Sequence, residues 1–168
     1  MNVRALPFLV LTAVAAAALI PRSAPSVPTG DPWVAGDVAW MLTATGLVLL
    51  MTPGLSFFYG GMVRFKNVVS TMLQSFVALG VISLLWVVVG FSLAFGDSLG
   101  GIVGNPLTFF MLDGVGAATH PDLSPTLPLL LFALFQLKFA IITPALITGA
   151  FAERVRFSSY LLFMILFS

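Results

Sequence analysis

The 168-residue chain has the composition of a membrane protein. Hydrophobic residues make up 60% of it and charged residues 8%, whereas soluble globular chains have roughly 45–50% and about 25%. The 16 phenylalanines exclude intrinsic disorder, and the lack of cysteine excludes disulfides, thiolate metal sites and a cysteine nucleophile. A net charge of +1 excludes a basic nucleic-acid-binding surface, so the expected surroundings are a lipid bilayer.

The first 24 residues have the pattern of a secretory signal peptide. Arg4 precedes an apolar, alanine-rich run that ends at Ile20, and residues 21–24 (PRSA) follow, with a candidate cleavage site near Ala24 to which Arg22 is poorly suited. The run is short compared with the roughly 20 apolar residues of a spanning helix; an uncleaved first helix is the alternative. Residues 25–36 are rich in turn residues and predict an extracytoplasmic lead-in.

Three later stretches are long and apolar enough to cross a bilayer. They are residues 38–63, 68–95 and 127–152, and Lys138 is the one charged residue inside them. In the connection between the second and third stretches, residues 107–112 are expected to lie along the membrane surface. A fourth apolar run, residues 157–168, is too short to cross. The predicted fold is an all-α membrane protein, a polytopic bundle of transmembrane helices.

The charges of the connections predict an orientation. Arg64 and Lys66 follow the first span, and Arg154 and Arg156 follow the third, whereas residues 97–126 hold aspartates but no lysine or arginine. The positive-inside rule therefore places the mature N-terminus outside a multi-pass protein of the plasma or inner membrane. A cleaved signal peptide would give the same arrangement.

The third span carries an apolar stripe with two interpretations. At 100° per residue its members lie within about 60° of one another: Phe135, Phe139, Ile142 and Leu146. Such a stripe usually packs against other helices. It could also line a narrow pathway whose mouth offers aromatic faces to a small cation, a contact worth roughly 0.5–2 kcal/mol.

The polar residues of the spans have several interpretations each. Gln136 is suited to bonding a neighbouring helix. Lys138 should face protein or water, either at an outer vestibule or in a subunit contact. Tyr59 is placed as an interface anchor, and His120 is interpreted as a solvated loop residue. No phosphate loop, HExxH motif or paired intramembrane carboxylates occur in the sequence, so we expect no enzyme activity, catalytic residue, metal or cofactor.

Four ordered stretches resemble motifs of ammonium transporters of the Amt/Mep/Rh superfamily, and of its Amt branch in particular. The first is residues 51–64 (MTPGLSFFYGGMVR), continued at 66–68, and the second is residues 86–96 (WVVVGFSLAFG). The third comprises residues 135–136, 139–140 and 142–150, and the fourth is residues 152–158 (AERVRFS). Each motif alone is modest, but their order over about residues 36–168 is specific, so residues 37–168 are expected to form the N-terminal part of such a transporter domain.

The resemblance implies an eleven-helix fold, a homotrimer with one pore per subunit, and transport of ammonium as ammonia. It implies that Phe139 is the inner gating phenylalanine and Phe135 the aromatic of the outer mouth. The matching positions along or below the hydrophobic conduit are Leu55, Tyr59 and Leu146. Gln136 matches without a known role, and Lys138 departs from the pattern because it stands where many relatives have a small or apolar residue.

Several parts that the family needs lie beyond residue 168. The resemblance places there the two pore histidines, of which His120 is not one, and the tryptophan and serine of the recruitment site. The present chain alone is therefore expected to be inactive. A PII-type regulatory protein is a candidate partner at the cytoplasmic face. The alternatives are a channel for other small solutes and a non-transporting membrane sensor.

Overall fold

The computed structural model describes residues 9, 12–13, 16 and 33–167. Most of the predicted signal peptide and most of the predicted lead-in lie outside the described residues. The elements, in chain order, are α2 (Ala35–Met62), the 3-10 turn η2 (Phe65–Asn67), α3 (Val68–Leu85), the π-helical turn η3 (Trp86–Gly90), α4 (Phe91–Phe95), strands β1 (Ser98–Leu99) and β2 (Val103–Gly104), the 3-10 turn η4 (Phe110–Leu112), α5 (Leu129–Phe151) and α6 (Phe157–Phe167).

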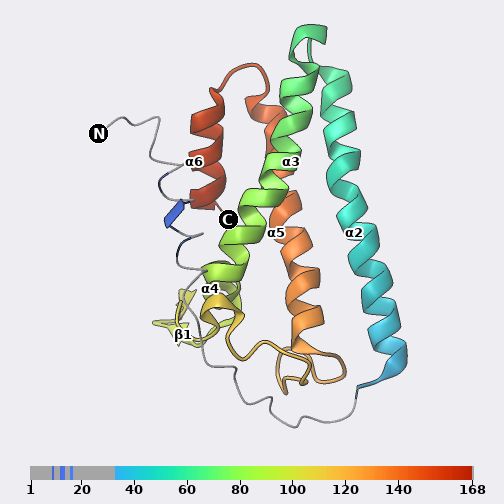
Figure 1. The fold of residues 1–168 in the computed structure, drawn as a ribbon, viewed down its shortest axis with the longest axis vertical. Helices are drawn as coiled ribbons and strands as arrows, with labels where there is room; N and C mark the ends of the chain where they lie inside the picture. The colour runs from blue at the N-terminus through green and yellow to red at the C-terminus, as the bar shows by residue number, and fades with distance from the viewer. Residues whose placement is uncertain (1–8, 10–11, 14–15, 17–32, 168) are drawn as a thin grey trace.

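Long helices lie side by side, and the hairpin and loop segments gather at one end of them (Figure 1). Within the described part of the chain, three helical stretches are long and apolar enough to cross a membrane: Ala35–Met62, Phe65–Phe95 and Leu129–Phe151. Each agrees with a predicted span to within about three residues, the usual uncertainty of helix ends. The prediction of an all-α membrane bundle is therefore confirmed.

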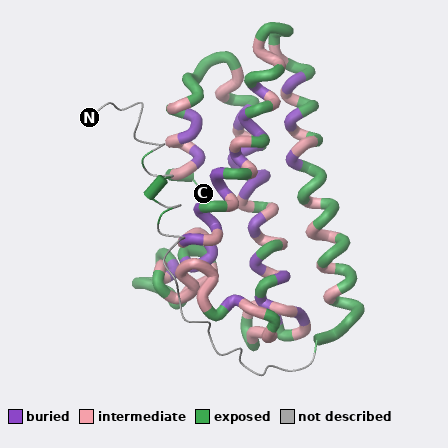
Figure 2. The backbone as a smooth tube through the Cα atoms, in the orientation of Figure 1, coloured by how far each residue is buried: buried purple, intermediate pink, exposed green. Residues whose placement is uncertain are grey.

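Helix α2 packs on α3 through small residues. Its buried residues, Thr52, Ser56 and Gly60, recur every fourth position and so share one face. The Ser56 hydroxyl donates to the Met72 carbonyl at 3.0 Å. Small residues let two helix backbones approach closely where lipid provides no hydrophobic drive for association. The rest of α2 is largely exposed (Figure 2).

The core lies where α3, α5 and α6 meet. Its fully buried members include Ala78, Ile82, Ala133, Ile141 and Met164. A buried contact of 2.9 Å between the hydroxyls of Thr148 and Tyr160 joins α5 to α6. The start of the fourth apolar run is thus anchored to the third span.

The connection between the second and third spans folds back onto the bundle. The Phe109 ring lies 5.3 Å from the Phe91 ring, and the Phe109 N–H donates to the Ser92 hydroxyl at 2.7 Å. Leu112 also packs against the core, while Leu107 remains 73% exposed. Residues 107–112 thus pack on the bundle, with the Phe109 ring in an aromatic cluster at the helix ends. Their location along the membrane surface stays a prediction.

Candidate pore-lining site on α5 and α2

Phe139 and Leu146 of the apolar stripe on α5 lie away from the core, whereas Ile142 of the same stripe is buried, at 4% exposed. Phe139 is 42% exposed and Leu146 is 50% exposed, whereas Leu137 and Ile141 on the other side of the helix are 5% and 1% exposed. This exposed part of the stripe is available to form one wall of a passage or a contact with a further helix.

The two aromatic residues of the stripe contact each other. The rings of Phe135 and Phe139 have centroids 5.1 Å apart and planes inclined at 69°, an edge-to-face geometry that aromatic pairs favour. Spacing of one helical turn brings the rings together, as the sequence predicts. They form a continuous aromatic surface along α5.

Tyr59 joins α2 to the same stretch of α5. Its hydroxyl donates to the Leu146 carbonyl at 2.6 Å, so two of the predicted site residues meet. The ring fits because residue 149 is glycine: a Cβ on Gly149 would lie 2.6 Å from Tyr59 Cε1. The hydroxyl of Tyr59 thus bonds a neighbouring helix, and its interpretation as an interface anchor stays a prediction.

The remaining predicted site residues are placed less decisively. Leu55 lies one turn before Tyr59 on α2, on the same face, and is half-buried. Gln136 and Lys138 are half-buried on α5. Their assignment to an outer vestibule stays a prediction.

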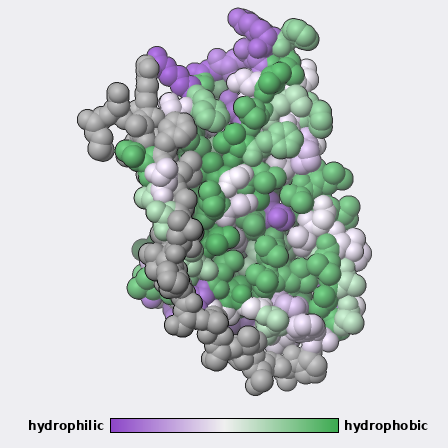
Figure 3. Space-filling model, viewed as in Figure 1, coloured by the Kyte–Doolittle hydropathy of each residue, from purple (hydrophilic) through white to green (hydrophobic). Residues whose placement is uncertain are grey.

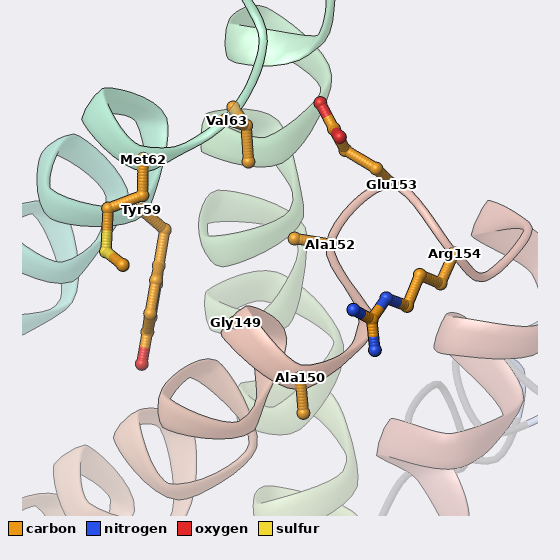
Figure 4. Close-up of a pocket in the computed structure, with 8 residues that line it drawn as sticks. All are labelled: Tyr59, Met62, Val63, Gly149, Ala150, Ala152, Glu153 and Arg154. Atoms are coloured by element: carbon orange, nitrogen blue, oxygen red, sulfur yellow. The ribbon is translucent and has the colours of Figure 1, made fainter.

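A hollow of about 260 Å³ lies where the first and third spans end. It is lined by Tyr59, Met62, Val63, Gly149, Ala150, Ala152, Glu153 and Arg154. Figure 4 shows Tyr59 and Arg154 on opposite sides of the hollow, with α5 passing below it. It has an apolar wall and charged groups at its rim.

Glu153 holds the two turns at this end together. One carboxylate oxygen accepts the Arg64 N–H at 2.9 Å and the Asn67 side-chain N–H at 2.8 Å. The second oxygen lies 3.8 Å from Arg64 Nε, a weak pair because the arginine side chain is 77% exposed. The Asn67 amide first, and then the Arg64 N–H, lower the pKa of the Glu153 carboxyl. The sequence indicates these turns by their positive charges and by the motifs at residues 66–68 and 152–158, but not the contacts of Glu153. Hydrophilic residues gather at this end of the molecule (the upper end in Figure 3).

At the other end of α5, the loop around His120 caps the helix. The N–H groups of Asp122 and Leu123 donate to His120 Nδ1 at 3.3 and 3.2 Å. The carbonyls of Ala118 and Gly116 accept the first N–H groups of α5. His120 is half-buried and shapes this loop, so the interpretation as a merely solvated residue was wrong. Among the described residues, no group of three metal-ligating side chains is close enough to hold a metal ion.

A family model described as Ammonium Transporter Family matches residues 39–168. The chain belongs to the ammonium transporter family. It is 50% identical over 141 residues to an ammonium transporter of Mycobacterium tuberculosis (strain ATCC 25618 / H37Rv), covering 76% of this chain and 30% of that protein. It is 47% identical over 133 residues to an ammonium transporter of Bacillus subtilis (strain 168), covering 79% of this chain and 32% of that protein.

The fold is also similar to solved structures of this family. The crystal structure of Saccharomyces cerevisiae Mep2 matches with a TM-score of 0.68 and 31% identity, over 80% of this chain and 30% of that chain. A Candida albicans Mep2 structure matches with the same TM-score and identity, over 80% of this chain and 29% of that chain. The chain thus spans about a third of the length of its relatives.

These comparisons confirm the family resemblance found in the four sequence motifs. They identify the chain as part of a membrane protein, in agreement with the three span-length apolar helices. The relatives are named transporters, so the chain belongs to a group of transport proteins and not of enzymes.

Proposed function

We propose that the full-length protein transports ammonium and that this chain supplies the aromatic mouth and part of the pore wall. The observation that carries the proposal is the edge-to-face pair of Phe135 and Phe139 on the partly exposed stripe of α5. The relatives named ammonium transporters support the choice of substrate.

The proposed passage selects its substrate by charge and by the ability to lose a proton. The Phe135 ring offers a cation–π contact to ammonium at the outer mouth. Beyond it lies the Phe139 gate, followed by a dry conduit that penalises any ion that stays charged. Ammonium can give up its proton and cross as ammonia, whereas potassium has no proton to give. The proton acceptors belong to the part of the relatives that this chain does not span.

The contacts at the inner end suit an apolar conduit. Tyr59 turns its hydroxyl onto the Leu146 carbonyl at 2.6 Å, and its ring packs over Gly149. Leu55 and Leu146 continue the apolar lining on α2 and α5. In this proposal Gln136 and Lys138 border the outer vestibule, where Lys138 adds a positive charge that would repel a cation.

Topology and assembly form part of the same proposal. Residues 1–24 act as a signal peptide, residues 25–36 lead into the membrane from outside, and residues 37–168 begin the transporter domain. The basic turn residues Arg64, Lys66, Arg154 and Arg156 favour a cytoplasmic location for that end. The full-length protein is a multi-pass homotrimer of the plasma or inner membrane, serves nitrogen uptake, and can receive a PII-type regulator on its cytoplasmic face.

These 168 residues by themselves would not transport. Phe139 and Leu146 are 42% and 50% exposed, so the proposed passage has one wall here and lacks the opposite one. Transport requires the helices that cover this face.

Growth on limiting ammonium tests the proposal. A host without ammonium transporters, carrying the full-length gene, should grow and take up methylammonium. Replacing Phe135 with Ala should raise the substrate concentration for half-maximal uptake by roughly 2- to 30-fold, because the cation–π contact is lost. Replacing Leu134 with Ala, at a neighbouring position that is 38% exposed, should leave it unchanged.

The rival functions give other results in the same cells. Flux of water or neutral solutes without ammonium uptake would indicate a different channel. A membrane-inserted protein with no solute flux would indicate a sensor. Either result would contradict the proposal.

A further inference from the structure

Trp86 lies where the second span departs from α-helical geometry. The π-helical turn Trp86–Gly90 follows α3 directly, and the Phe91 N–H bonds to the Trp86 carbonyl, five residues back. A π turn inserts one extra residue into the helix and often occurs at functional sites. Here it brings the Trp86 and Phe91 rings into edge contact at 5.9 Å.

The indole of Trp86 reaches across to α5. Its N–H donates to the Ala133 carbonyl at 3.1 Å, and this hydrogen bond is buried. In an α-helix this carbonyl also accepts the N–H of residue 137, so the indole uses its second lone pair. Ala133 is 1% exposed and precedes Phe135 by two residues. The bond therefore links the second span to the turn of α5 that carries the aromatic mouth.

The surrounding packing allows the indole little freedom. Trp86 is 8% exposed, and the Phe95 ring lies 6.3 Å from it. On the far side, a Cβ on Gly90 would lie 3.2 Å from Trp86 Cε3. Phe95 in turn contacts Phe132 of α5 at 5.1 Å. The N–H thus meets Ala133 from a direction that the neighbouring side chains determine.

We propose that Trp86 is a positioning residue for ammonium recruitment: its indole N–H fixes the outer turns of α5 and thereby the Phe135 ring at the mouth. The inference rests on the proposed function and deepens it. Trp86 acts through the α5 backbone, so it affects how well the mouth binds the cation more than how fast the bound substrate crosses.

The test is Trp86→Phe in the full-length protein, with methylammonium uptake measured over a range of concentrations. The variant keeps an aromatic ring for Phe91 and Phe95 and removes the N–H. The expected result is a KM about three- to ten-fold higher, the effect of losing one buried hydrogen bond, with kcat changed less than about two-fold. Trp40→Phe is the matched control, because Trp40 is 74% exposed on α2, and both constants should stay unchanged.

A second variant displaces the indole without removing it. Gly90→Ala puts a methyl group against the Trp86 ring, so it should raise KM in the same way. If Trp86→Phe fails to accumulate in the membrane, Gly90→Ala decides the question by the same criterion. If the wild type transports ammonium but the deciding variant has an unchanged KM, or shows only a lowered kcat, this inference alone is overturned. A wild type without uptake would overturn the proposed function and this inference with it.

Discussion

Tyr59 and Gly149 form a matched pair of residues, one large and one small. The Tyr59 ring lies over the position where any other residue would place a Cβ, and its hydroxyl reaches the Leu146 carbonyl. Glycine inside a helix usually destabilises it relative to alanine. At position 149 the close approach of the Tyr59 ring explains why the residue is glycine, since a Cβ there would collide with the ring.

Replacing Tyr59 with Phe should destabilise the full-length protein by about 0.6 kcal/mol, the average for an interhelical hydrogen bond in a membrane. Replacing Gly149 with Ala should cost more, because the new methyl group displaces the ring as well as the bond. Unfolding in mixed detergent measures both changes. The control is Thr43→Val, which removes a hydroxyl that bonds only within its own helix. Equal stability of the Tyr59→Phe variant and the wild type would show that the hydrogen bond from Tyr59 to Leu146 contributes nothing to the free energy of unfolding.

At the scale of elements, the turn after α2 and the turn after α5 are joined by one carboxylate. Glu153 adopts a left-handed φ of 64°, which is uncommon for a residue with a side chain. In this conformation one carboxylate oxygen of Glu153 accepts hydrogen bonds from the Arg64 N–H and the Asn67 side-chain amide. The two turns consequently hold the ends of α2, α3 and α5 in register around the hollow of Figure 4.

This carboxylate gives the junction a pH dependence. The folded-state pKa of Glu153 is lowered from 4.5, so its stabilising contribution is complete above about pH 4.5 and is lost as the pH falls through the folded-state value. Hydrogen exchange of the Arg64 amide, corrected for the intrinsic rate, should lose protection over that acid range. Glu153→Ala should show low protection at neutral pH and no further acid loss.

The matched control for this junction is Asp37→Asn, which changes an exposed carboxylate near the opposite end of α2. It should keep the full acid response of the Arg64 amide. If Glu153→Ala keeps the same response as the wild type, another group controls the junction.

For the molecule as a whole, hydropathy was enough to predict the long helices. A run of about 20 apolar residues in lipid must satisfy its backbone hydrogen bonds internally, and an α-helix does this. The pairing of Phe135 with Phe139 followed from helical spacing alone. The bond from Tyr59 to Leu146 could not be predicted, since it depends on how α2 and α5 cross. The π turn at Trp86 and the role of Glu153 likewise depend on tertiary contacts that have no local pattern in the sequence.

Orientation is the property of the whole molecule that most directly follows from charge. Because the chain has no cysteine, single cysteines can report which side of the membrane each end occupies. Phe65, 96% exposed in the basic turn after α2, and Ile102, 92% exposed in the β1–β2 hairpin, are suitable positions. In intact cells carrying the full-length protein without other cysteines, Ile102→Cys should react with a membrane-impermeant maleimide. Phe65→Cys should react only after permeabilisation, since basic turns stay in the cytoplasm.

The opposite labelling pattern would mean that the basic turns face outward. The aromatic pair would still line α5, but the end of α5 that carries Phe135 would then face the cytoplasm, and the rings could not recruit ammonium from outside. Labelling of both positions in intact cells would indicate leaky membranes, which an unreactive cytosolic marker protein excludes. These two cysteines therefore test the orientation of the helices, on which the placement of the Phe135 ring at the outer side depends.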